Sequence, residues 1–110
     1  MKTFVNLTPH AVRVLDSDGS VAAEFPPSGT VARVATKSEP VNTLHGVPIF
    51  RVVRGSVQGL PDGDGPFIVS LLVRESLPDD TRLFSPGELR RGPDGQPVGC
   101  VGLTCNGGAL

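Results

Sequence analysis

Hydrophobic and polar residues alternate in several short stretches of the chain. Within Ala11–Leu15, Val12 and Val14 alternate with Arg13. After the turn sequence Asp16–Gly19, Val21, Ala23 and Phe25 lie at every second position. A period of two is typical of a strand with one buried face, and a Gly-containing turn between two such runs predicts a β-hairpin. Phe4–Leu7 predicts a further short strand, and Pro9 predicts a bend after it.

The middle of the chain combines a strongly β-like segment with a polar one. Thr30–Thr36 is rich in residues that favour strands, which predicts a strand. Val31, Arg33 and Ala35 would lie on one face of it, and Ala32 and Val34 on the other. Lys37–Leu44 is polar and ends at His45-Gly46. Pro48–Val53 predicts the next strand, which we expect to continue past Gly55.

The most apolar run, residues 67–73, predicts a strand that is followed directly by a helix. We expect a strand over Phe67–Val69 and the chain's one short helix over Ser70–Leu77. The Ser70 hydroxyl is suited to cap the first turn of that helix, and Pro78 is suited to end it.

The C-terminal part predicts more short strands. We expect a short segment at Arg82–Phe84, a turn at Ser85–Gly87, a hairpin turn at Gly92–Gly95 and a strand over Val98–Leu103. In all, the pattern predicts one domain spanning residues 1–110. Its fold class is mainly β, a small barrel or sandwich of six to eight short strands with one short α-helix near residues 70–77.

Composition agrees with this pattern and narrows the function classes. The chain has 14 Gly and 11 Pro in 110 residues, which argues against a helical bundle. Its net charge of −1 and the lack of a long basic block argue against binding to duplex nucleic acid. Because Trp and Tyr are absent, a nucleotide pocket would depend on hydrogen bonds, Arg and backbone groups.

Targeting and metal signals are weak. We find neither a signal-peptide pattern at the N-terminus nor an apolar run near 18 residues, so we expect a cytoplasmic chain without membrane contact. Cys100 and Cys105 are expected to be free thiols. A zinc site would need two more ligands, and the two histidines are far away in the sequence, so no metal and no cofactor are expected.

The densest polar group in an apolar region is formed by Asn6, Thr8 and His10. On an extended chain these three side chains would share one side, where an amide, a hydroxyl and an imidazole could hold a phosphate. His10 and Thr8 are the candidate catalytic residues, because histidine titrates near neutral pH. In the alternative interpretation, Asn6 and Thr8 satisfy backbone groups of a turn, while His10 hydrogen-bonds a carbonyl.

Arg33 and Ser70 complete the candidate site, together with Asn6, as substrate-binding residues. Arg33 lies within the β-like segment and can bind an anion in a bidentate manner, although it is equally suited to a solvent-facing position. Ser70 could contribute to a phosphate cradle at the start of the predicted helix, or it could act only as the helix cap. The other arginines, including Arg74 and Arg82, are expected to be surface charges.

Several motifs occur in a fixed order along nearly the whole chain. They are NLTPHxVxV, PPSGTVARV, GVP, VxGLP, IVSLLV, SPGEL and DGxPVGC. This order resembles a family of small proteins encoded by bacteriophages and prophages, with Asn6–His10 and Pro26–Val34 as its most specific parts. By analogy of size and context, the chain is similar to anti-CBASS and anti-Thoeris counter-defence proteins, which sequester or cleave host nucleotide immune signals. The resemblance implies a location in the cytoplasm of an infected bacterial host.

Three functional hypotheses follow. The first is metal-independent cleavage of a cyclic dinucleotide, with His10 as acid or base and Arg33 as phosphate clamp. The second is a non-catalytic sponge that sequesters a nucleotide with the same residues, in a pocket formed between the subunits of a homo-oligomer. The third is a structural protein of the virion or an inhibitor of a host enzyme. It predicts an exposed apolar patch instead of a concave polar pocket.

Overall fold

The computed structural model describes residues 3–107 of the chain. It confirms the mainly β fold class, with eight strands and one short helix. The elements, in chain order, are β1 (Val5–Asn6), β2 (Val12–Leu15), β3 (Val21–Phe25), β4 (Arg33–Leu44), β5 (Val47–Gln58), β6 (Phe67–Ile68), α1 (Leu71–Ser76), β7 (Leu83–Arg91) and β8 (Pro97–Cys105).

Six strands form one sheet that nearly closes into a barrel. Its order is β1-β6-β7-β8-β2-β3, in which β2–β3 and β7–β8 are antiparallel hairpins and the other pairs are parallel. An isolated bridge between Asn6 and Pro27 brings the chain just after β3 back to β1, at the other end of the sheet order. Both hairpins were predicted, because their turns are encoded locally.

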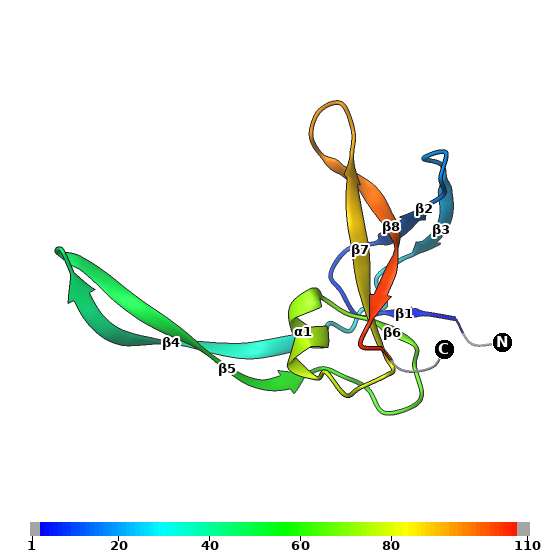
Figure 1. The fold of residues 1–110 in the computed structure, drawn as a ribbon. Coiled ribbons are helices and arrows are strands. Elements are labelled where there is room, and N and C mark those ends of the chain that lie inside the picture. Colours follow the sequence, from blue (N-terminus) through cyan, green and yellow to red (C-terminus); the bar gives the residue numbers. More distant parts are fainter. Residues whose placement is uncertain (1–2, 108–110) are drawn as a thin grey trace.

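The strands β4 and β5 form a separate two-stranded ribbon, which we call the arm (residues Arg33–Gln58). The arm extends away from the rest of the molecule, which we call the core (Figure 1). The radius of gyration is accordingly 16.8 Å, against about 13 Å for a compact domain of similar length.

The polar segment Lys37–Leu44, for which the sequence predicts no strand, is the outer part of β4. It pairs with β5 across the two-residue turn His45-Gly46, where both residues have positive φ values of 49° and 78°. Two positive φ values match the tight turns that fit the twist of a hairpin. The segment has no alternating apolar pattern because both faces of the arm lie in solvent.

The turn predicted at Ser85–Gly87 is wrong, because this segment is part of the long strand β7. Pro86 pairs with Leu103 within the β7–β8 ladder. A Cβ atom at Gly87 would lie 2.5 Å from the carbonyl oxygen of Val101, so glycine allows the neighbouring strand to come close. Gly87 therefore allows close strand packing, and the chain turns only after Arg91.

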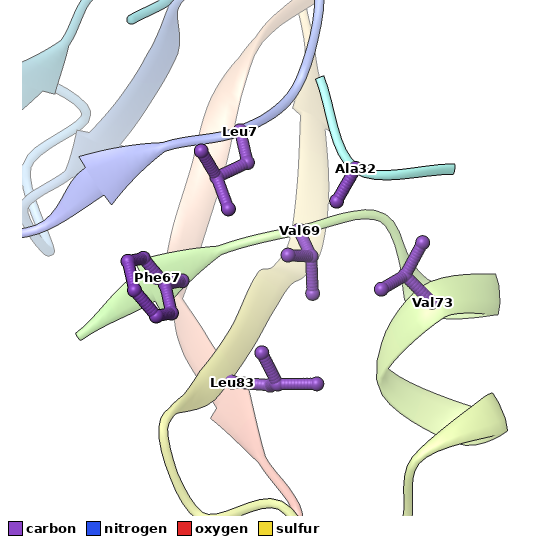
Figure 2. Packing of buried hydrophobic residues seen from close by; sticks show 6 residues of the cluster. All are labelled: Leu7, Ala32, Phe67, Val69, Val73 and Leu83. Carbon is purple, nitrogen blue, oxygen red and sulfur yellow. The ribbon is translucent and has the colours of Figure 1, made fainter. Parts of the chain in front are cut away.

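The core contains a main cluster of buried hydrophobic residues that joins β1, β6, β7 and α1 to the base of the arm. Figure 2 shows these side chains converging from separate segments of the chain. They are Leu7, Ala32, Phe67, Val69, Val73 and Leu83. A second buried cluster consists of Val12 from β2, Ile68 from β6 and Cys100 from β8.

The helix begins as predicted. Ser70 is its N-cap, and the Ser70 Oγ accepts a 3.3 Å hydrogen bond from the Val73 backbone N–H. Cys100 and Cys105 are free thiols, also as predicted. No helix among residues 3–107 is both long and apolar enough to cross a membrane.

Candidate functional site

The Asn6 side chain is almost completely buried, with 1% of its surface exposed. Its Nδ2 donates 2.8 Å hydrogen bonds to the carbonyl oxygens of His10 and Phe25. Its Oδ1 accepts from the Thr8 backbone N–H at 2.9 Å and from the Thr8 hydroxyl at 2.6 Å. Both N–H donors of the amide are therefore used inside the protein, which is the turn-stabilising role that the alternative interpretation predicted.

Thr8 and His10 belong to the same turn, and the segment is bent instead of extended. The Thr8 Oγ1 lies 2.9 Å from the His10 carbonyl oxygen as well as close to Asn6, so its single proton is shared between two internal acceptors. The His10 backbone is thus held in place, while the His10 residue is exposed. The catalytic roles of Thr8 and His10 stay predictions.

Arg33 and Ser70 are both exposed. Arg33 is the first residue of the arm and pairs with Gln58 across the ribbon. Within the described residues, no ion pair or hydrogen bond engages the Arg33 side chain. The substrate-binding roles of Asn6, Arg33 and Ser70 also stay predictions.

Three of the predicted site residues border the same buried cluster. Thr8, Arg33 and Ser70 each directly follow a residue of the main cluster, whose inward-pointing members are seen in Figure 2. The Ala32 backbone N–H donates a 3.0 Å hydrogen bond to the Leu7 carbonyl oxygen, which joins the first two of these segments directly. The fold therefore brings three distant segments to the base of the arm.

A small cleft lies elsewhere, between β2 and the β7–β8 hairpin. It has a volume of about 160 Å³ and a mostly apolar lining that includes Val12, Leu89, Val98 and Cys100. None of the five predicted site residues lines this cleft. Its chemistry suits an apolar side chain and not a nucleotide phosphate, since Arg13 is its one charged lining residue.

Two arginines that were expected to be surface charges instead hold the core together. The Arg74 Nε donates a 2.8 Å hydrogen bond to the Oγ of buried Ser85, and its Nη1 donates 3.0 Å bonds to the Cys105 carbonyl and the Asn106 side chain. These bonds fix α1 against β7 and the end of β8. The partners lie up to 32 residues away in the sequence, so no local pattern reveals them.

Arg82 organises the loops beside the helix. Its guanidinium forms a bidentate pair with Asp80, with nitrogen–oxygen distances of 3.0 and 2.7 Å, and its Nη1 donates a 3.0 Å bond to the Gly63 carbonyl. The guanidinium carbon lies 5.4 Å from the centre of the Phe67 ring. Hydrogen bonding from Arg82 lowers the pKa of Asp80, and the same pairing raises the pKa of Arg82.

The arm carries the largest group of exposed apolar side chains. Val52 is 64% exposed, Leu44 59% and Phe50 58%. The whole group comprises seven residues, Val41, Leu44, Val47, Ile49, Phe50, Val52 and Val53. Adjacent strand residues point to opposite faces, so Phe50 and Ile49 place apolar surface on both sides of the ribbon.

The sequence predicts the strand at Pro48–Val53, but it carries no signal that the apolar side chains of this strand lie in solvent. Comparison of the chain with protein-family models, curated proteins and solved structures finds no match. Within residues 3–107, no group of three or more His, Cys, Asp or Glu residues is placed to hold a metal ion.

Proposed function

We propose that the chain is a non-catalytic protein-binding or assembly protein, and that the arm is its binding element. The observation that carries this proposal is the group of seven exposed apolar side chains on the arm. It corresponds to the third hypothesis from the sequence, which predicted an exposed apolar patch. Together with the resemblance to bacteriophage proteins, it suggests a component of the virion or an inhibitor of a host enzyme.

The energetics of a lone ribbon support a partner. A two-stranded hairpin is at best marginally stable in water, because neither face is covered. Burying one Phe, Val or Leu side chain contributes about 1.5–3 kcal/mol. Covering only Phe50 and Val52 would therefore contribute several times the free energy that one hydrogen bond contributes to stability.

The two edges of the arm indicate how a partner would bind. Pro40 lies in β4 opposite Phe50, and Pro48 lies in β5 opposite Thr43. Proline has no N–H to donate, so each edge lacks a donor that an added strand would need. The partner is therefore expected to pack against the side chains of the two faces.

Site-specific crosslinking tests the proposal. A photoreactive phenylalanine analogue replaces Phe50 in the arm, and the matched control carries it at Asp94 in the β7–β8 turn. We expect the Phe50 position to form one discrete protein adduct in cells that express the chain. Equal or absent crosslinking at both positions would overturn the proposal.

We propose nucleotide sequestration as a second candidate function. It is supported by the placement of Thr8, Arg33 and Ser70 around the base of the arm. Because the Asn6 amide donors are engaged, such a site would use Arg33 and backbone N–H groups to hold phosphate oxygens.

Calorimetric titration with 3′,3′-cyclic dinucleotides, in the presence of a chelator, tests this second candidate. We expect Arg33→Ala to abolish binding and Arg13→Ala, which removes an exposed partner of Glu24, to leave it unchanged. Ligand that is released intact on heating supports sequestration, whereas altered ligand supports cleavage by His10. No heat of binding to the unmodified chain contradicts both nucleotide hypotheses.

A further inference from the structure

We infer that the arm of one copy of this chain binds the acidic surface beside helix α1 on the core of a second copy. This inference depends on the proposed function, because it names the partner of the arm. It is carried by a separation of charge between the arm and the core.

The arm and the core have opposite net charges. The arm contains four basic residues and one acidic residue, a net charge of +3, while the other residues of the chain have a net charge of −4. The four arm cations, Arg33, Lys37, Arg51 and Arg54, are exposed, and within residues 3–107 none of them forms an ion pair or side-chain hydrogen bond. A second copy therefore offers the arm a surface of opposite charge, which steers association and fixes orientation.

The negative charge of the core is concentrated in residues 59–82. This segment contains five acidic and two basic residues. On α1, Leu71 is 52% exposed, and Glu75 is exposed one helical turn later on the same face. Exposed Asp79 follows the end of the helix. Leu71, Glu75 and Asp79 define what we call the acidic surface.

One face of the arm has the complementary pattern. Lys37 lies opposite Val53, and Glu39 lies opposite Arg51, so these four side chains share a face of the ribbon. Val53, which is 38% exposed, is thus flanked by the cations Lys37 and Arg51. On the arm, Val53 and its two cations can therefore face Leu71 and the two acids of the acidic surface on the second copy.

Charge also excludes the two simplest alternatives. Pairing of two arms along this face would bring Lys37 and Arg51 of both copies together with only Glu39 to offset them, which is unfavourable for like charges. The arm extends away from its own core (Figure 1), and its cations form no ion pair with the acids of that core. The core of a second copy is the remaining surface of matching charge within the protein.

Light scattering coupled to gel filtration tests this inference with a charge exchange. We expect the unmodified chain to self-associate, and the arm variant Lys37→Glu/Arg51→Glu to weaken association by about tenfold or more. The core variant Glu75→Lys/Asp79→Lys should weaken it to the same extent. Combining all four substitutions should restore it. Arg90→Glu/Arg91→Glu, outside the arm, is the matched control and should leave association unchanged.

Salt provides a second measurement that needs no variant. Association should weaken toward an ionic strength of about 1 M, where the screening length is about 3 Å. A monomeric unmodified chain, or a fourfold variant that does not reassociate, would overturn the inference. If the chain is monomeric while Phe50 crosslinks to a different protein, the inference fails and the proposed function stands.

Discussion

The side chain of Asn6 is hydrogen-bonded to the backbone of Phe25, with 2.8 Å between Nδ2 and the carbonyl oxygen. Asn6 belongs to β1 and Phe25 to β3, the two strands at opposite ends of the sheet order. The buried Asn6 side chain therefore joins the two edges of the sheet, in addition to the isolated backbone bridge between Asn6 and Pro27. Phe4, two residues before Asn6, adds an edge-to-face ring contact with Phe25 at 5.4 Å.

We predict that Asn6→Ala destabilises the protein by about 1–3 kcal/mol, because it removes the partner of the Phe25 and His10 carbonyls. Urea unfolding measures this change. Asn42→Ala, an exposed arm residue that bonds only its neighbour Thr43, is the control and should change stability by less than about 0.5 kcal/mol. Equal effects of the two substitutions would contradict the structural role of Asn6.

We predict that Arg74→Met destabilises the protein by about 1.5–3 kcal/mol, because it breaks hydrogen bonds from a charged group that tie α1 to Ser85 and the end of β8. Thermal unfolding followed by circular dichroism measures this loss. The matched control is Arg90→Met, since Arg90 pairs only with exposed Glu88. An Arg74 variant as stable as the Arg90 variant would show that the bonds to Ser85 and Cys105 contribute little.

Local signals explain what the sequence could predict about the fold. The β2–β3 hairpin depends on the turn Asp16–Gly19, and the helix depends on Ser70 and Pro78, which all lie within a few residues of the elements they define. The outer half of β4 lacks such a signal, because its strand conformation comes from pairing with β5 and not from burial. A solvated ribbon leaves no alternating pattern to detect.

The candidate site shows the same limit. The side chains of Asn6, Thr8 and His10 would share one side only of an extended chain. The chain bends after Leu7, and the Asn6 amide binds backbone groups of that bend. The Asn6 amide also binds the Phe25 carbonyl, a partner 19 residues away that no local pattern reveals. Ser70 could be placed correctly, because a helix cap acts within three residues.

Asp80 predicts a pH dependence of stability. Hydrogen bonding from Arg82 lowers the pKa of Asp80 below its ordinary value of about 3.9. A lowered pKa in the folded state means that this stabilisation is fully present above the ordinary value. It is lost as the pH falls through the lowered pKa.

We therefore predict that Asp80→Asn costs about 1 kcal/mol at neutral pH, and that the difference from the unmodified chain shrinks as the pH falls below the ordinary pKa of an aspartate and through the lowered pKa of Asp80. Urea unfolding across this pH range measures both values. Asp94→Asn is the control, since an asparagine there can still accept from the Gln96 N–H. A difference that stays constant with pH would contradict the contribution of the Asp80–Arg82 pair.

Gly59 sets the junction between the arm and the core. It has a positive φ of 83°, and a Cβ atom there would lie 2.3 Å from the Val31 carbonyl oxygen. Gly46, at the arm tip, has a similar φ of 78° but no atom within 4 Å of such a Cβ. Replacing either glycine with a residue that has a Cβ atom would therefore strain the backbone. Only at Gly59 would the Cβ atom also clash with a neighbouring carbonyl.

We predict that Gly46→Ala costs about 1 kcal/mol and that Gly59→Ala costs about 1–3 kcal/mol more, because the backbone of residues 31 and 59 must separate. Chemical unfolding of both variants gives the two values. Hydrogen exchange locates the effect, which should appear at the Ala32 amide that bonds to Leu7. Equal stability of both variants would show that the arm is not anchored by this contact, since Gly46 reports the strain alone.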